Sequence, residues 1–200
     1  MNSHVFISPG DPAGIGPEIT LKSLKNLDKR HKFVIAGDIQ YLENLSRSLK
    51  LGLEFTAYEG SKTSYDSKLI KVINISLHTK PVLGSSSVNN AEYILEVLTS
   101  CAKHCLENTK NILVTGPINK ETISASGTNF SGHTEFLAEQ AKIDSPLMLM
   151  ANKKIKIGLA TTHIPIREVS NSITEDLIHT KLKILTQGLK KLLKKENLKI

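Results

Sequence analysis

Aromatic side chains are scarce in this sequence of 200 residues. Tryptophan is absent, and aromatic residues make up only 4% of the chain. Flat rings are the surfaces on which single-stranded bases stack, so their scarcity disfavours a nucleic-acid partner. The net charge of +7 does not reverse this, because the lysines are scattered except for Lys190-Lys191 and Lys194-Lys195. We interpret the charge as a solubility feature with a bias toward anionic substrates, such as phosphorylated metabolites.

Cysteine and long apolar runs are also nearly missing. Cys101 and Cys105 are the 2 cysteines, four residues apart on a predicted helix. No second cysteine pair is present to complete a metal site, so we expect two small buried hydrophobic side chains. The sequence shows no signal-peptide pattern and no apolar run near the length of a membrane span. We therefore expect a cytoplasmic protein with no membrane partner.

Strand and helix patterns alternate along the first 115 residues. Helical spacing of apolar residues begins at Pro17, at Ile39 and near Val88, the last pattern running to Leu106. The strands that separate these helices are predicted at 4–7, 33–36, 69–76 and 112–115. Such alternation is typical of a three-layer α/β/α fold with a mostly parallel sheet.

Another pattern follows in the last third of the chain. Strands near 147–150 and 155–161 are close enough to form a hairpin around Asn152-Lys153. Ser172 and Glu175 form a capping box that predicts the start of a long last helix. The predicted buried side of this helix contains Leu177, Ile178, Leu182, Leu185, Leu189, Leu192 and Leu193. Residues 198–200 resemble the first half of another core strand, which predicts a truncated chain.

The segment Ser8–Glu18 concentrates three glycines and three prolines between a strand and a helix. Glycine opens positive φ angles and proline fixes φ, so this composition predicts a rigid and unusual backbone path. The glycine spacing does not match the dinucleotide fingerprint, and no Gly-Lys-Ser/Thr follows as in phosphate loops of NTPases. We interpret the segment as an active-site loop, although a purely structural loop is the alternative.

Two other predicted strands run into polar clusters, at Thr115–Lys120 and at Thr161–His163. Ligands of open α/β sheets bind beyond the carboxyl ends of the strands, so we expect these ends to meet the glycine loop at one crevice. That convergence favours an enzyme.

Two histidines are candidate site residues. His133 lies where Gly132 and Thr134 mark a loop that passes into a helix. A helix start offers free N–H groups and a positive dipole end, so His133 and Thr134 can hold a phosphate or carboxylate there; a surface or capping histidine is the alternative. His163 is predicted to end the strand over 157–162 and could bind a divalent metal, yet one histidine is not a site. Lys120, Asp11 and Glu18 lie near the site by motif only, and loop stabilisation explains them equally well.

Four motifs in order resemble a known family. The segments Ser8–Glu18, Thr115–Lys120, Gly132–Glu139 and Ala160–Arg167 are similar to those of 4-hydroxythreonine-4-phosphate dehydrogenase, an enzyme of pyridoxal phosphate (vitamin B6) biosynthesis. The resemblance spans essentially the whole chain.

The resemblance implies an oxidation that uses NAD or NADP. The substrate, 4-phosphooxy-L-threonine, is oxidised to 2-amino-3-oxo-4-phosphooxybutyrate, which decarboxylates to 3-amino-2-oxopropyl phosphate. It further implies a divalent metal, such as zinc, cobalt or magnesium, held by three histidines, of which His163 matches one. His133 and Thr134 match residues that bind substrate. The proton acceptor stays unassigned.

The resemblance also implies a fold like those of isocitrate and isopropylmalate dehydrogenases, with two domains around a cleft. A homodimer with its active site at the subunit interface is expected. Full-length members are longer, so we expect residues 1–200 to be an amino-terminal portion that lacks the remainder of the second domain and two metal ligands. A related dehydrogenase of 4-phosphoerythronate, or a truncated, non-catalytic phosphate-binding fragment, is the alternative.

Overall fold

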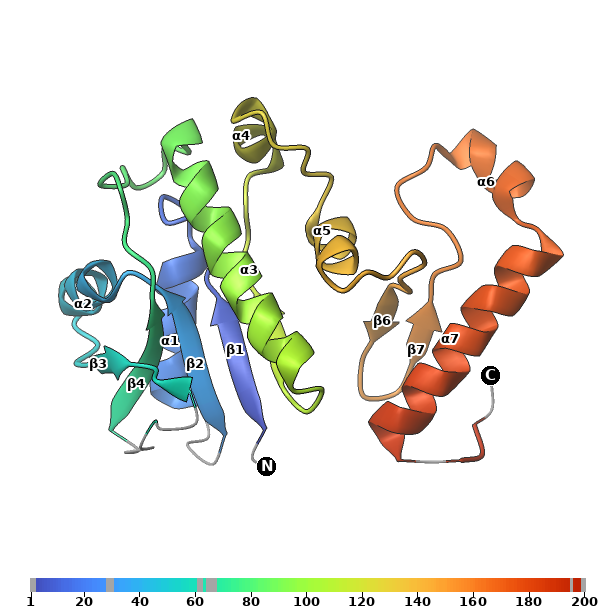
Figure 1. Ribbon diagram of the computed structural model, residues 1–200, viewed down its shortest axis with the longest axis horizontal. Helices are drawn as coiled ribbons and strands as arrows, with labels where there is room; N and C mark the ends of the chain where they lie inside the picture. Colours follow the sequence, from blue (N-terminus) through green and yellow to red (C-terminus); the bar gives the residue numbers. More distant parts are fainter. Residues whose placement is uncertain (1–2, 28–30, 61–62, 64–67, 195, 199–200) are drawn as a thin grey trace. The chain divides into compact units, whose positions relative to one another are not determined.

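The computed structural model describes residues 3–27, 31–60, 63, 68–194 and 196–198. The chain divides into two compact units, residues 1–142 and 143–200 (Figure 1). Each unit has its own sheet. The two are therefore described separately.

A parallel sheet of five strands forms the centre of the first unit, in the order β3-β4-β2-β1-β5. Its strands are β1 (His4–Ser8), β2 (Lys32–Gly37), β3 (Glu54–Ala57), β4 (Leu69–Asn74) and β5 (Ile112–Thr115). Every neighbouring pair is parallel, and Ile7 of β1 is level with Ile35 on one side and Val114 on the other. All five carboxyl ends consequently reach the same edge of the sheet.

Helices cover both faces of this sheet. The helices of the unit are α1 (Gly16–Asn26), α2 (Ile39–Ser48), α3 (Ala91–Glu107, preceded by the 3-10 turn η2 at Val88–Asn90), α4 (Lys120–Ala125) and α5 (His133–Gln140). Leu21 of α1 and Leu42 of α2 pack with Ile35 on one face. Helix α3 covers the other face. The predicted three-layer α/β/α fold is therefore confirmed.

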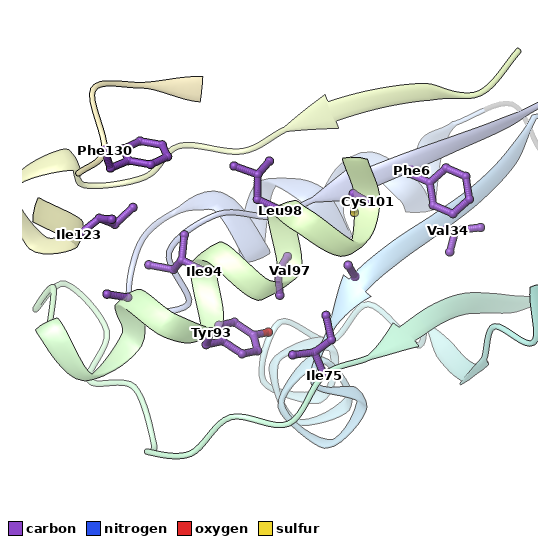
Figure 2. Packing of buried hydrophobic residues seen from close by; sticks show 12 residues of the cluster. Phe6, Val34, Ile75, Tyr93, Ile94, Val97, Leu98, Cys101, Ile123 and Phe130 are labelled. Atoms are coloured by element: carbon purple, nitrogen blue, oxygen red, sulfur yellow. The ribbon is translucent and has the colours of Figure 1, made fainter. Parts of the chain in front are cut away.

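The larger core cluster lies under α3. Figure 2 shows Ile94, Val97, Leu98 and Cys101 along this helix. Phe6 and Val34 belong to the same cluster, as do Ile123 and Phe130 from the segments after β5. The core thus fixes the connection that follows β5, which carries the predicted site residues.

Both cysteines are free thiols. Cys101 is fully buried in the core cluster, and Cys105 is half-buried against it. Burial raises the pKa of the Cys105 thiol to about 11. The prediction of small hydrophobic side chains is confirmed for Cys101 and fits the packing of Cys105.

The strand β3 was not predicted. Its four residues, Glu54 to Ala57, lie at the sheet edge and include no fully buried side chain. A short edge strand needs little hydrophobicity, because only one of its neighbours is a strand and its outer side meets solvent. The sequence pattern therefore gives no signal for it.

The second unit contains the predicted hairpin. Its elements are β6 (Leu149–Ala151), β7 (Lys156–Gly158), α6 (Ile166–Ser172) and α7 (Glu175–Leu193). The strands pair antiparallel, and the Asn152 side chain accepts hydrogen bonds from the N–H groups of Lys154 and Ile155, each at 2.8 Å. The prediction that Asn152-Lys153 forms the turn is confirmed.

The strand before His163 is shorter than predicted. Strand β7 ends at Gly158, so His163 does not end a strand. Continuing the register would place Pro146 opposite Thr161, and proline has no N–H to donate to a ladder. The sequence analysis was wrong on this point because apolar alternation continues past the last partner.

The predicted capping box is also wrong. Thr174 caps α7, and its Oγ1 accepts a hydrogen bond from the N–H of Leu177 at 3.2 Å. Ser172 instead ends α6 and donates to the carbonyl of Glu168 at 2.8 Å. The unpredicted short helix α6 uses the serine that would have capped α7.

The apolar side of α7 is less buried than predicted. Leu189 is buried and Leu177 and Leu185 are half-buried, whereas four of the seven predicted side chains are exposed, namely Ile178, Leu182, Leu192 and Leu193. Leu185 contacts the hairpin at Gly158, where an added Cβ would lie 3.3 Å from its methyl carbon. A two-stranded hairpin is too narrow to cover a helix of 19 residues. Among the described helices, none combines the length and apolar character needed to cross a membrane.

The histidine stacked on the core predicts a loss of stability in acid. The rings of His104 and Phe6 are stacked, with centroids 4.9 Å apart, and burial lowers the pKa of His104 despite Glu107 nearby. A lowered pKa gives stability that is complete above the unfolded value of about 6.5 and is lost as pH falls through the folded value. We expect His104→Phe to flatten the fall of the unfolding free energy between about pH 7.5 and pH 5.

All four tyrosines fall within residues 1–142, so tyrosine fluorescence during urea unfolding reports the first unit. His179→Phe, at an exposed position of α7, is the control and should keep the parent's pH profile. An unchanged slope in His104→Phe would contradict the assignment.

Candidate functional site

The glycine loop after β1 packs directly on the segment after β5. Asp11 N–H donates to the Pro117 carbonyl at 3.1 Å, and Gly116 N–H donates to the Ser8 carbonyl at 2.6 Å. An added Cβ at Gly10 would collide with the Pro117 carbonyl, and one at Gly16 or Gly116 with the Pro9 carbonyl. These glycines allow two backbones to touch. Two of the three predicted strand ends are therefore together.

The third strand end belongs to the second unit. His163 lies there, outside the hairpin and exposed to solvent. The convergence of this segment with the glycine loop stays a prediction.

A buried carboxylate holds the glycine loop in shape. Asp11 is only 3% exposed, and its two oxygens accept hydrogen bonds from Ala13 N–H at 2.9 Å and from Ser86 Oγ at 3.0 Å. Asn119 Nδ2 reaches the same Ser86 hydroxyl at 3.5 Å. Asp11 thereby links the loop to the segments before α3 and α4. The sequence analysis missed Ser86, because a serine in a loop carries no pattern that identifies its partner.

Two further bonds fix the tip of this loop. Tyr41 of α2 donates its hydroxyl to the Pro12 carbonyl at 2.7 Å, and Gly84 N–H donates to the Ala13 carbonyl at 2.8 Å. Burial, together with the charge of Asp11, raises the pKa of Tyr41 to about 12. The hydroxyl thus remains a donor at neutral pH. Three other segments therefore hold the loop, namely the segment after β5, helix α2 and the loop before α3.

A cavity of about 500 Å³ opens beside this junction. It is lined by Asp11, Gly14, Ile15, Ser86, Pro117, Ile118, Asn119, Lys120 and Glu121. Its charged groups come from the segments after β1 and β5, and Ser86 comes from the loop before α3. Ligands of open α/β sheets bind beyond such carboxyl ends of strands. The cavity lies beside two of the predicted strand ends, and its lining does not include His133 or Thr134.

Helix α5 begins at His133, as predicted, with Gly132 in the capping position. The Nε2 atom of His133 is buried and finds no hydrogen-bond partner among the described residues. Burial lowers the pKa of His133, and the positive charge of Lys120 lowers it further. His133 is therefore a neutral imidazole near neutral pH with one ring nitrogen unused. Thr134 follows it, half-buried, in the first turn of α5.

Lys120 reaches the start of α5 from α4. A Cβ added at Gly132 would lie 3.2 Å from Lys120 Nζ and 2.9 Å from Glu135 Oε2. The structure thus brings together Lys120 and His133, which lie in separate motifs of the sequence. Glu18, the third residue of uncertain role, instead pairs with Lys22 on α1 at 2.5 Å, and both side chains are exposed. That contact is an ordinary surface ion pair.

His163 has an unusual backbone conformation. Its φ is 59°, in the left-handed region that a non-glycine residue seldom adopts. The other three such residues, Lys50, Lys142 and Lys194, lie at or just beyond the ends of helices, where this conformation is common. His163 lies between a strand and a helix, so this explanation does not apply. Backbone strain of this kind occurs preferentially at functional sites.

The donor set for a metal ion is incomplete in the described part of the chain. No group of three His, Cys, Asp or Glu side chains there could hold a metal ion. His163 therefore does not complete a metal centre with the described residues alone.

The glycine loop does not have the geometry of a dinucleotide cradle. The space that side chains would need at Gly10 and Gly16 is filled by the carbonyls of Pro117 and Pro9. Glycines of a dinucleotide loop instead let a pyrophosphate approach the backbone. At Gly10 and Gly16 the missing side chains therefore make room for protein backbone.

The steric role of Gly10 can be measured against a glycine with the same backbone conformation. Gly10 has φ 89° and meets the Pro117 carbonyl, whereas Gly127 has φ 87° and no atom within 4 Å of an added Cβ. Gly127→Ala should cost on the order of 1 kcal/mol of unfolding free energy from backbone strain alone. We expect Gly10→Ala to cost at least about 2 kcal/mol more, because the collision adds to that strain. Equal losses in urea unfolding would show that the two loops do not press on each other.

Comparison with known proteins gives a consistent result. The family model described as pyridoxal phosphate biosynthetic protein PdxA matches residues 28–200. A 4-hydroxythreonine-4-phosphate dehydrogenase of Serratia proteamaculans is 32% identical over 191 residues, covering 94% of this chain and 58% of the relative. One of Erwinia tasmaniensis is 34% identical over 188 residues, covering 93% of this chain and 57% of the relative. The chain thus spans less than two thirds of the length of these curated relatives.

Solved structures agree. A 4-hydroxythreonine-4-phosphate dehydrogenase from Klebsiella pneumoniae superposes with a TM-score of 0.82 at 27% identity, covering 95% of this chain and 59% of that one. One from Burkholderia phymatum gives a TM-score of 0.83 at 24% identity, over 94% of this chain and 58% of that one, and supports the fold. With the family model matching most of its length, the chain belongs to the PdxA family of pyridoxal phosphate biosynthetic proteins.

Proposed function

We propose that this chain belongs to a dehydrogenase that oxidises 4-phosphooxy-L-threonine with NAD or NADP, in the biosynthesis of pyridoxine 5'-phosphate. The product, 2-amino-3-oxo-4-phosphooxybutyrate, would lose carbon dioxide to give 3-amino-2-oxopropyl phosphate. The observation that supports this most is the position of His133. Its unused ring nitrogen lies at the start of α5, in the segment that resembles the family's substrate-binding motif.

His133 and Thr134 are proposed to bind the substrate. The first-turn N–H groups of α5 have no helical acceptor and carry the positive end of the helix dipole. A neutral imidazole and a threonine hydroxyl beside them can each donate a hydrogen bond to a phosphate oxygen. Asp11 supports the neighbouring wall of the cavity by fixing the glycine loop.

His163 is proposed as one ligand of a divalent metal such as zinc, cobalt or magnesium. When bound, such a metal would supply Lewis acidity, which would make the substrate hydroxyl more acidic. The unusual backbone conformation of His163 supports a functional role, and the described residues would not complete its ligand set. The cofactor, NAD or NADP, is inferred from the family alone. A homodimer with a shared active site, and a cytoplasmic location consistent with two free thiols, complete the proposal.

The function is tested by NAD and NADP reduction with added divalent metal. We expect turnover with 4-phosphooxy-L-threonine as substrate. Turnover with 4-phosphoerythronate alone would identify a related dehydrogenase and overturn the substrate assignment. Phosphate binding without reduction of either cofactor would favour the non-catalytic alternative.

The role of His163 is tested with two substitutions that treat its backbone differently. His163→Gly suits the φ of 59°, so it should fold at least as stably as the parent, whereas His163→Ala keeps the strain. We expect both variants to lose metal-dependent turnover by about 10²-fold or more, the order that a metal ligand or its support contributes. Full turnover in a folded His163→Gly protein would remove the metal role.

A further inference from the structure

Two opposite charges lie near each other at the start of α5 without forming an ion pair. Glu135 is in the first turn of this helix, and its Oε2 atom would lie 2.9 Å from a Cβ added at Gly132. Lys120 reaches the same point from α4, with its Nζ atom 3.2 Å from that Cβ. Yet within the described part of the chain neither side chain forms an ion pair within 4.0 Å. Both charges can therefore act on a ligand.

The carboxylate of Glu135 lacks the partner that is usual at its position. A glutamate at the third position of a helix commonly accepts a hydrogen bond from the N–H of the capping residue. Gly132 caps α5, but Glu135 forms no hydrogen bond with it and no ion pair with any described residue. Glu135 is half-buried, so water screens its charge less than that of the exposed Glu121 or Glu139. Its lone pairs are unused, although the helix dipole favours its charge.

The substrate of the proposed function has the complementary arrangement of charges. Its phosphate is assigned to His133 and Thr134, which leaves a carboxylate and an ammonium group. These two groups are attached to the same carbon atom, so they too are opposite charges that are close without neutralising each other. The protein's own carboxylate and ammonium can each form a charge-assisted hydrogen bond to the group of opposite sign. A 2-hydroxy acid such as 4-phosphoerythronate carries a hydroxyl in place of the ammonium and cannot compensate a carboxylate.

We propose that Glu135 binds the ammonium group of the substrate and so selects an α-amino acid over the corresponding 2-hydroxy acid, with Lys120 facing the carboxylate on the same carbon. Glu135 is thus a specificity-determining residue. The inference rests on the proposed function for the identity of the substrate. Its physical basis is the unpaired carboxylate of Glu135 beside the ammonium of Lys120.

The experiment measures the binding of two ligands that differ in this one group. 4-Phosphooxy-L-threonine and 4-phosphoerythronate are titrated calorimetrically into the intact protein, without NAD or NADP and with the same divalent metal present throughout. The measured quantity is the ratio of the two dissociation constants in each protein, because specificity is a difference of affinities. Effects of a substitution on the fold or on the phosphate contacts, which both ligands share, cancel in this ratio.

Four proteins are compared: the parent, Glu135→Gln, Glu121→Gln and Glu139→Gln. Each substitution removes one negative charge and keeps the size of the side chain. Glu139 is exposed on the same helix, so its variant controls for the effect of net charge on a charged ligand. Glu121 lines the cavity together with Lys120, so its variant tests the neighbouring carboxylate as the partner of the ammonium.

We expect the parent to bind 4-phosphooxy-L-threonine at least about tenfold more tightly than 4-phosphoerythronate, the effect of one hydrogen bond between charged groups. Glu135→Gln should reduce this preference by at least about tenfold, through weaker binding of the amino acid. Its affinity for 4-phosphoerythronate should stay the same or rise, because a negative charge beside an anionic ligand is removed. Glu121→Gln and Glu139→Gln should keep the parent's ratio within about threefold, because exposed charges contribute little.

Four results would overturn the inference. The parent could bind neither ligand, or it could bind 4-phosphoerythronate as tightly as the amino acid. Glu135→Gln could keep the parent's ratio. Finally, Glu121→Gln or Glu139→Gln could lose the preference as fully as Glu135→Gln does, which would show that the effect does not belong to Glu135.

Turnover separates this inference from the proposed function. If the parent prefers 4-phosphooxy-L-threonine through Glu135 but does not oxidise it, the proposed function fails and the ammonium site stands. If the parent oxidises this substrate and Glu135→Gln keeps the parent's ratio of dissociation constants, the ammonium site fails and the function stands. Turnover by the parent together with loss of the preference in Glu135→Gln supports both.

Discussion

The contact between the two loops that follow β1 and β5 is the constraint on which the rest of the site depends. These strands are neighbours in a parallel sheet, so the segments beyond them start side by side. Without side chains at Gly10 and Gly116 the two backbones can approach until N–H and carbonyl groups form hydrogen bonds between the loops. Any larger residue there would force the loops apart and move the start of α4. The position of Lys120 follows from this contact.

The buried carboxylate of Asp11 extends the same constraint to other parts of the first unit. It bonds to the loop itself and to Ser86, and Tyr41 secures the loop from α2. These hydrogen bonds join residues that lie up to 75 positions apart in the sequence. A site built in this way needs no rigid element of its own, since the sheet and the core under α3 supply the rigidity. This explains why an exposed junction of loops can hold defined geometry.

Apolar patterns in the sequence predicted those elements that pack against large neighbouring surfaces. Strands β1, β2, β4 and β5 are buried between two helix layers and show continuous apolar runs, which makes them recognisable. Apolar periodicity gave wrong predictions where the neighbouring structure is small. In the second unit the apolar run beyond Gly158 has no strand to pair with, and α7 has only a hairpin beside it. Apolar periodicity reports what could be buried, while the extent of the neighbour decides what is buried.

In the candidate site, too, features set by neighbouring residues could be predicted, whereas contacts between residues distant in the sequence could not. The start of α5 at His133 could be predicted from sequence, because Gly132 and the polar residues after it form a local signal. The contact between Lys120 and that helix could not, because it depends on the path of the chain from β5 through α4, and no spacing rule describes it. Lys120 Nζ lies against a helix end that carries partial positive charge, and Lys120 forms no ion pair among the described residues. Such local conflict is expected where a sequence is adapted to hold a ligand, since the missing negative charge then arrives with the ligand.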